Sequence, residues 1–568
     1  MVRPHILYSL PSILYPPLYT LYPLPSTLYP LSSTLYPLSS TLYPLPSTLY
    51  PPLSTLYSLP STLYPLPSMF TRFMFTLHRV TGTLLSLLFV VWFVSGIVMM
   101  YHGFPRVTAD DRLARLEPLD TADLPPVESV LRRVPDSLGH IDGLSVSRYL
   151  GQTVFEVHAG DETLRLPADS TQSLPTIDAA YLRRVAAAWC DAPIAAVDTL
   201  RDLDQWIPFG RLREELPILR FRFADADHTQ LYVASRTGEV LQRTTLKERI
   251  WAWLGPIPHW VYFTRLRQDA DLWRRTVIWL SGIGCIMVIA GLYVGIYTTV
   301  QARRRRQKRF IPYKKRWYYW HHLTGLVFGL FTLTWAFSGM MSLADPPEWF
   351  MPQHAPSAAQ DTIKALAPNP ASYPMDYREA FTTDYTYFEA PITQIRWTHF
   401  FGRPAYEVRL QDEKEGQTLD ATTLRPLALT REQVTEAVRR LHASDAQLST
   451  ESMVDYDTYY FDRKGRLPLP VYRIRVADAD HTTYYINPAN GQLRDYSDHR
   501  RAGFWMYKGL HSLRFPFLID HPALWTVVMW VLLLGGTAVS VSGFVLGLRY
   551  IGRLSRRKRR GKRKTGDV

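Results

Sequence analysis

LHRVTG, residues 77–82, stands at the start of a segment of at least 21 residues without a charged side chain. HHLTG, residues 321–325, opens a second segment of the same kind, with its histidine 243 residues further along. An ionisable side chain at the edge of a lipid bilayer is costly unless it has a partner. A histidine at the mouth of an apolar segment, repeated in both halves of the chain, therefore predicts a membrane protein with a duplicated imidazole site.

Four segments of the chain, each at least 21 residues long, lack charged side chains. About 20 residues at about 1.5 Å rise per residue cross a hydrocarbon core of about 30 Å, so each segment predicts a transmembrane helix. We expect spans at 70–102, 273–300, 317–344 and 522–550, separate domains at 103–272 and 345–521, a basic loop at 301–316 and a basic tail at 551–568.

Lys and Arg gather at two flanks of these spans. The loop after the second span holds nine basic residues between Arg303 and Arg316, and the tail holds nine from Arg553 to Lys564. The positive-inside rule places both in the cytoplasm. We therefore expect a multi-pass protein of the bacterial inner membrane, in contact with lipid, with both termini cytoplasmic. Topology explains these charges, and the net charge of +14, without a nucleic-acid partner.

The N-terminal segment 1–68 is dominated by a seven-residue repeat of the type LYPLPST. A proline in nearly every unit breaks helices and favours extended chain. One interpretation is a disordered recognition or wall-spanning segment. The favoured interpretation is a misplaced start, with translated upstream repeats and a true first residue at Met69 or Met74.

The two halves of the chain align around their first spans. HRVTG (78–82) matches HHLTG (321–325), and WFVSG (92–96) matches WAFSG (335–339). Between the spans, FRFADADHTQLYVASRTGEVLQ (221–242) matches residues 472–493. Repeats of this kind pack about an axis along the membrane normal in other duplicated membrane proteins. We therefore expect a duplicated four-helix transmembrane bundle.

The segments between the spans show the periodicities of soluble domains. Residues 221–242 alternate around the turns ADAD and RTG, which predicts a strand meander. Residues 179–189 and 431–443 have the spacing of amphipathic helices. The motif ADADHT, at 224–229 and 477–482, has the side chains of a metal site but is interpreted as a polar turn. The expected fold is an integral membrane protein, mainly α, with two extracytoplasmic α+β domains.

Histidines near the predicted membrane edges are candidate haem ligands, because helices can hold haem iron through neutral imidazoles. His78 and His321 correspond in the repeat at the cytoplasmic edge, and His259 and His511 correspond at the outer edge. We expect each pair to ligate one haem through its iron. His102 and His322 are reserve ligands, with His322 expected to face lipid headgroups. The alternative is that all are interfacial histidines without a cofactor.

The LHRxxG opening, the outer segments ending in YVASRTGEV and YINPANGQL, and the LH before the last span resemble the PepSY-associated transmembrane family. The resemblance covers residues 70 to about 550. It implies PepSY-type outer domains and, from the ferrisiderophore-reductase members, two haem b groups. The absence of CxxCH agrees with non-covalent haem.

The resemblance implies a di-haem oxidoreductase that passes electrons across the inner membrane. A quinol or a cytoplasmic reductase would be the donor, and a ferric siderophore is a candidate extracytoplasmic acceptor. The alternative is a membrane-anchored PepSY interaction protein, regulatory and peptidase-inhibitor-like, without redox activity. A transporter is disfavoured because the spans contain neither acidic side chains nor breaks.

Overall fold

The computed structural model describes residues 68–565 apart from 161, 306–310, 355–361, 364, 382–387, 389, 412–415, 443–445 and 463–466. The side chains beyond Arg556 are not described either. The expectations for the N-terminal repeat therefore lie outside the described residues, except for Ser68. The side chain of Ser68 accepts a hydrogen bond from the Thr71 backbone N–H and caps the first helix.

Four helices long and apolar enough to cross a membrane confirm the four predicted spans. The first three lie within a few residues of the predicted bounds, and the last continues through the basic tail. The helices are α1 (Met69–Met99), α8 (Ala270–Arg304), α9 (Arg316–Met341) and α14 (Pro522–Thr565).

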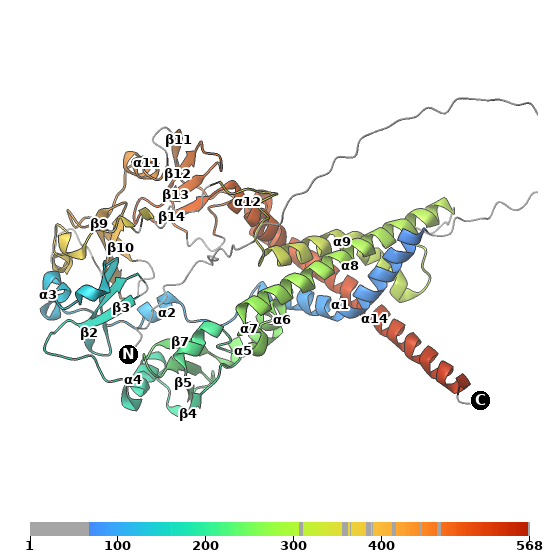
Figure 1. Cartoon of the computed structure of the whole chain (residues 1–568), viewed down its shortest axis with the longest axis horizontal. Helices are drawn as coiled ribbons and strands as arrows, with labels where there is room; N and C mark the ends of the chain where they lie inside the picture. Colours follow the sequence, from blue (N-terminus) through green and yellow to red (C-terminus); the bar gives the residue numbers. More distant parts are fainter. Residues whose placement is uncertain are drawn as a thin grey trace, which may run out of the picture.

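The four long helices pack into one bundle. Helices α1 and α9 each pack against both α8 and α14, so α1 and α9 lie diagonally opposite one another (Figure 1). Phe89, Phe93, Met287, Trp335 and Leu533 belong to the buried core between them. Facing side chains on such helices can meet in the interior, where bundles hold cofactors.

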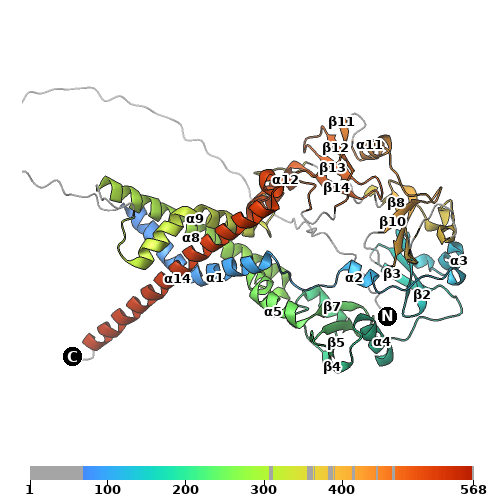
Figure 2. The same cartoon turned by 180° about the vertical axis from the view of Figure 1, so that it is seen from behind.

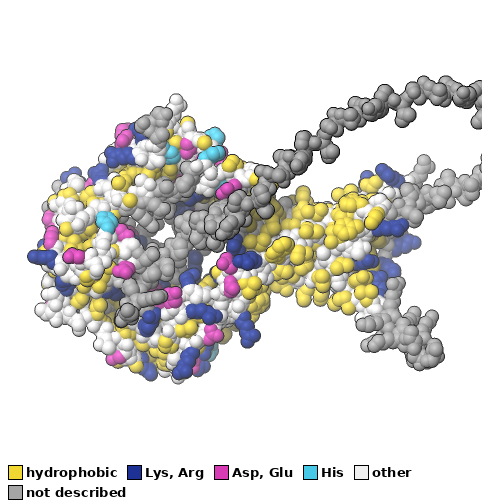
Figure 3. All heavy atoms as spheres, in the orientation of Figure 1, with side chains coloured by type: hydrophobic (Ala, Val, Ile, Leu, Met, Phe, Trp, Pro, Cys, Tyr) yellow, Lys and Arg dark blue, Asp and Glu magenta, His cyan; other side chains and the backbone are white. Residues whose placement is uncertain are grey.

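The outer surface of the bundle is apolar. Leu84 and Trp279 are 74% and 69% exposed, as expected of side chains that contact lipid rather than water. Figure 3 shows hydrophobic side chains over the visible face of the bundle, with Lys and Arg at the end remote from the sheets. We call this the basic end, where α8 ends and α9 begins, and the opposite end the domain end.

The segments outside the bundle form three antiparallel sheets among the described residues, of six, four and four strands. The prediction of a mainly α protein is therefore wrong for this part of the chain. It was dominated by the apolar spans, whereas the segments between them are α+β as predicted. The membrane part is helical and the part at the domain end is rich in strands (Figure 2).

The six-stranded sheet takes strands from both segments, in the order β10-β9-β8-β1-β2-β3. Strand β1 pairs with β8, with Val146 opposite Ile395. Both side chains are fully buried in one core. The strands are β1 (Gly143–Tyr149), β2 (Gln152–Ala159), β3 (Glu162–Pro167), β8 (Ile392–Phe400), β9 (Arg403–Leu410) and β10 (Gln417–Asp420).

Each four-stranded sheet belongs to one segment, and the two have the same order, β4-β5-β6-β7 and β11-β12-β13-β14. Helices α4 (Ala179–Trp189) and α11 (Arg431–Arg439) confirm the predicted helices and pack on these sheets. The strands are β4 (Ile194–Leu200), β5 (Ile218–Phe223), β6 (Gln230–Ala234), β7 (Val240–Thr244), β11 (Leu448–Met453), β12 (Val471–Val476), β13 (Thr483–Ile486) and β14 (Leu493–Tyr496).

The two ADADHT motifs form the same polar turn in each sheet. Asp225 accepts hydrogen bonds from the backbone N–H and the hydroxyl of Thr229, at 2.8 and 2.6 Å. Asp478 does the same for Thr482, at 2.7 and 2.6 Å. These contacts confirm the turn interpretation over a metal site.

Short helices at the domain end connect the sheets to the spans. They follow β7 in the first segment and β14 in the second, and each set carries one of the candidate histidines. In the first segment they are α5 (Leu246–Leu254), α6 (Pro256–Trp260) and α7 (Thr264–Arg267), and in the second α12 (Asp498–Phe504), the π-helical turn Trp505–Gly509 and α13 (Pro516–Ile519). The remaining short α-helices, α2 (Ala109–Leu113) and α3 (Val127–Leu131), lie between α1 and β1.

Candidate functional site

Two of the predicted histidines meet inside the bundle near its basic end. His78 extends from α1 and His321 from α9, the two diagonal helices. Their ring centroids are 6.0 Å apart and their planes differ by 28°. We call His78 and His321 the basic-end pair. The pairing predicted from the repeat is therefore present as a contact.

The neighbouring helices hold each imidazole of this pair through its Nδ1 atom. His78 Nδ1 lies 3.0 Å from the carbonyl oxygen of Met287 in α8. His321 Nδ1 lies 3.2 Å from the carbonyl oxygen of Val539 in α14 and 3.1 Å from Ser542 Oγ. A carbonyl oxygen can only accept, so each Nδ1 is the donor and carries the ring proton. In a neutral ring Nε2 then keeps its lone pair, as a metal ligand requires.

Glycines on the neighbouring helices make room for this pair. A Cβ at Gly291 would lie 2.6 Å from His78 Cε1. A Cβ at Gly543 would lie 3.1 Å from His321 Cε1. The first distance is too short for any side chain, and the second is tight. Helices α8 and α14 can therefore approach the imidazoles closely because these positions have no side chain.

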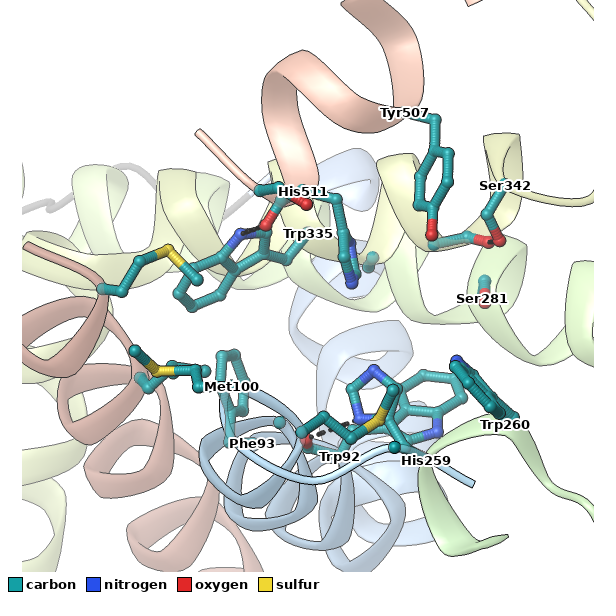
Figure 4. A pocket seen from close by; sticks show the side chains of 18 of the residues that line it. Trp92, Phe93, Met100, His259, Trp260, Ser281, Trp335, Ser342, Tyr507 and His511 are labelled. Carbon is teal, nitrogen blue, oxygen red and sulfur yellow. Dashed lines mark hydrogen bonds between the residues drawn. The ribbon is translucent and has the colours of Figure 1, made fainter. Parts of the chain in front are cut away.

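The other two predicted histidines meet at the domain end. His259 lies in α6 and His511 follows the π-helical turn. Their ring centroids are 6.2 Å apart, with planes at 71°. We call them the domain-end pair. Figure 4 shows both imidazoles extending into one cavity from opposite sides.

The domain-end pair is also held through Nδ1. His259 Nδ1 lies 3.0 Å from Ser95 Oγ and 3.1 Å from the Trp92 carbonyl oxygen, both in α1. His511 Nδ1 lies 3.0 Å from Ser338 Oγ in α9. Burial lowers the pKa of His259 to about 3 and that of His511 to about 4. Both imidazoles are therefore neutral at pH 7, the form that binds a metal.

The domain-end pair lines a cavity of about 970 Å³. Its walls are largely apolar, with Trp92, Trp260 and Trp335 around the imidazoles (Figure 4). Arg106 and Arg514 also line it. A mostly apolar cavity with a few polar groups is the usual form of a cofactor site, and this volume lies near the upper end of the usual range.

The contacts of the two halves correspond residue by residue. His78 and Ser95 precede His321 and Ser338 by 243 residues, and Met287, Gly291 and His259 precede Val539, Gly543 and His511 by 252. At the basic end the ring, its carbonyl acceptor and its neighbouring glycine are thus repeated, and at the domain end the ring and its serine partner. Two similar apolar segments would not need the same hydrogen-bond partners in order to pack. The repeated polar contacts are therefore a separate likeness between the halves.

The reserve ligands lie outside both pairs. His102 stacks on Trp251, with ring centroids 4.2 Å apart and planes 7° from parallel. His322 is only 8% exposed, and its Nε2 lies 2.9 Å from Thr299 Oγ1 in α8. The expectation that His322 faces lipid headgroups is wrong, because the helical turn that points His321 into the bundle points His322 towards α8.

The donor set of each pair fits a haem better than a bare metal ion. Metal–imidazole bonds are about 2 Å long, so two imidazoles on opposite sides of one ion have ring centres roughly 6 Å apart. Both pairs meet this distance. Structural zinc sites take four protein ligands and catalytic ones three, but no group of three or more His, Cys, Asp and Glu side chains occurs among the described residues. The remaining ligands would then come from the cofactor, as in a porphyrin.

Sequence reasoning found the histidines but missed the residues that orient them. Ser95 and Ser338 stand in the aligned motifs WFVSG and WAFSG, so the signal was present there. Gly291 and Gly543 gave no local signal, because glycine is common in membrane helices. Their role is visible only once α8 and α14 are placed beside the imidazoles.

A four-span bundle with histidine pairs at both ends and a strand-rich part at one end defines a polytopic membrane protein with a candidate cofactor site. The chain belongs to the family described as the PepSY-associated TM region, whose model matches residues 145–450, more than half of its length. The match includes His259 and His321. Comparison with curated proteins finds no match.

Proposed function

We propose that the protein is an inner-membrane b-type di-haem oxidoreductase that passes electrons across the membrane to an extracytoplasmic acceptor. The observation that carries the proposal is the pairing of buried imidazoles at both ends of one bundle. In each pair Nδ1 is held by the protein, and among the described residues two imidazoles are the candidate protein ligands. His78 and His321 would hold one haem, and His259 and His511 the other.

The bound haem groups would supply reversible one-electron chemistry. The chain would contribute the imidazoles that hold them and set the basicity of these imidazoles through the Nδ1 hydrogen bonds. Phe89, Phe93 and Trp335 lie in the apolar core of the same bundle and exclude water from it. His78 and Ser95, which contacts His259, are 17 residues apart on α1, or roughly 25 Å. With this separation, one pair would lie near each face of the membrane.

The orientation of the protein in the membrane is inferred from the charge distribution. Arg303 and Arg304 end α8, and Arg316 begins α9, at the basic end. The positive-inside rule places this end in the cytoplasm of a bacterium, with both termini, and the sheets outside. A quinol or a cytoplasmic reductase would then serve as donor. The family resemblance suggests a ferric siderophore as acceptor.

The correspondence of contacts supports an origin by duplication. The two halves would each supply two spans, one four-stranded sheet and half of each histidine pair. Neither half holds two ligands of the same pair, because His78 and His259 come from the first half and their partners from the second. Both copies are therefore required for either haem.

A visible spectrum of the purified full-length protein, with haem quantified as the pyridine haemochrome, tests the proposal. We expect two haem b per chain and a Soret band that shifts on reduction with dithionite. A colourless protein from haem-replete cells would sink the proposal. That result would favour the alternative, a PepSY interaction protein without redox activity.

A further inference from the structure

A second cavity, of about 540 Å³, lies among the sheets of the outer part rather than in the bundle. Its walls come from α2, the β1–β2 turn, α4 and the β6–β7 turn. We call it the arginine groove, after Arg112, Arg115, Arg165, Arg184 and Arg396, which line it. Its volume is within the usual range for a small-molecule site.

Three of these arginines are already neutralised. Arg112 pairs with Glu239 at 3.2 Å, Arg165 with Glu156 at 2.8 Å and Arg396 with Glu407 at 3.2 Å. Arg115 and Arg184 have no carboxylate within ion-pair distance among the described residues. Two positive charges in the groove are therefore uncompensated, which favours an anionic ligand.

These two arginines stand over aromatic rings. The Arg115 guanidinium lies 5.6 Å from the ring centroid of Trp189, and the Arg184 guanidinium lies 5.6 Å from that of Tyr181. Stacking of this kind orients a guanidinium and leaves its N–H groups available to an acceptor. The charges are thus held at the wall of the groove.

Tyr149 and Tyr181 complete the aromatic wall. Burial raises the pKa of Tyr149 to about 12, so its hydroxyl stays protonated and can donate to an anion. Tyr181 packs against the turn at Gly238, where φ is +70° and a Cβ would lie 2.7 Å from the ring. A glycine is required there, and it lets the turn close one side of the groove against Tyr181.

The equivalent place in the second half lacks the arginine and the tryptophan that line the groove. The N-cap residues of α4 and α11, Asp178 and Thr430, are 252 residues apart, so Arg184 corresponds to Glu436 and Trp189 to Leu441. Glu436 pairs with Arg439 on its own helix, at 2.8 Å.

Packing in the second half closes the same space. After the first strand of each half, Tyr149 and Leu150 precede Gly151, and Phe400 and Phe401 precede Gly402. Phe400 and Phe401 are buried in the core of the second half, whereas Tyr149 and Leu150 are only partly buried. The groove is therefore formed mainly by the first half, with Arg396 from β8 at its wall, and is not a by-product of the shared scaffold.

We propose that the arginine groove binds a small organic anion, one acidic group on an aromatic body, between Arg115 and Arg184. The acid would accept hydrogen bonds from the guanidinium groups and from the Tyr149 hydroxyl. The aromatic body would pack on Leu113 and Leu174, which also line the groove. The site lies apart from both histidine pairs and does not depend on haem.

Saturation-transfer NMR with the full-length protein in micelles, at low salt, tests this proposal. The probes are benzoate and phenyl phosphate, which share the anionic aromatic chemistry and differ in the acid, with benzamide as the neutral analogue and empty micelles as background. We expect saturable binding of at least one anion and none of benzamide. Binding of only one anion identifies the acid that the groove prefers.

The variant Arg115→Gln/Arg184→Gln should weaken binding at least about tenfold, because hydrogen bonds to charged groups are lost. Arg183→Gln is the matched control, an exposed arginine on the same helix that does not line the groove. Tyr149→Phe provides a second test that retains both charges and should also weaken binding. The proposal is overturned if neither anion binds, if benzamide binds equally, or if the double variant binds like the parent.

Discussion

The imidazoles of His78 and His321 lie with their ring centres 6.0 Å apart, on two helices that occupy diagonal positions in the bundle. Each ring is held by a carbonyl oxygen from a different neighbouring helix, Met287 in α8 and Val539 in α14. All four spans therefore contribute to this one contact.

Replacing one ligand should remove one haem and leave the other. On the proposed function we expect His78→Ala and His321→Ala each to halve the haem content, because each removes one of the two imidazoles that would hold the haem at the basic end. His259→Ala and His511→Ala should also halve it, with loss of the other haem. Pyridine haemochrome quantitation and reduced-minus-oxidised spectra measure both outcomes.

His322→Ala and His102→Ala are the matched controls for these ligand variants. His322 contacts Thr299 and His102 stacks on Trp251, so both variants should retain two haem groups per chain. Loss of a haem from His102→Ala, with retention in His259→Ala, would contradict the assignment of the domain-end pair.

Gly291→Ala should expel the haem of the basic-end pair although no ligand is changed. The added Cβ would lie 2.6 Å from His78 Cε1, so the ring must move. Alanine has a higher helix propensity than glycine, so α8 itself should not be weakened. Gly325→Ala, where nothing lies within 4 Å of the added Cβ, should leave the spectrum unchanged. Equal spectra for the two variants would show that this close approach is not needed.

Ser338→Ala should loosen the domain-end haem. The hydroxyl lies 3.0 Å from His511 Nδ1, and loss of such a partner typically lowers metal affinity by about 10- to 100-fold. Ser342→Ala is the control, because Ser342 lines the same cavity but donates to the Gly339 carbonyl instead. The rate of haem transfer to apomyoglobin measures the difference. An unchanged rate of haem transfer in Ser338→Ala would show that this serine does not help to hold the haem.

The helices and the local strand meanders could be predicted because their patterns are local. A span needs only a long uncharged segment, and residues 221–242 contain their own turns. The pairing of β1 with β8 could not be predicted, because the choice between strand partners far apart in sequence depends on where the intervening spans place them. The histidine pairs were predictable only through the repeat, and the serines and glycines around them only from the packed helices.

The shared sheet can be tested with a disulfide across its centre. Ser147 in β1 is the register partner of Gln394 in β8, so Ser147→Cys/Gln394→Cys should form a disulfide on oxidation. Ser147→Cys/Arg396→Cys is two residues out of register, where diagonal Cα atoms lie about 7–8 Å apart, and should not. After proteolysis in the 301–316 loop, the linked halves should migrate together without reductant. Separate fragments in both variants would contradict the pairing.

The central strand pair also imposes a schedule on biosynthesis. Ser147 and its partner Gln394 are about 250 positions apart in the chain. At about 5–20 residues per second, β1 leaves the ribosome roughly 10 to 50 s before β8 exists. In the proposed orientation the apolar face of β1 has been translocated during that interval, two more spans have still to insert, and the edge of the nascent sheet is open. An extracytoplasmic chaperone that covers exposed strand edges is therefore the kind of helper whose loss should reduce the yield of this protein most.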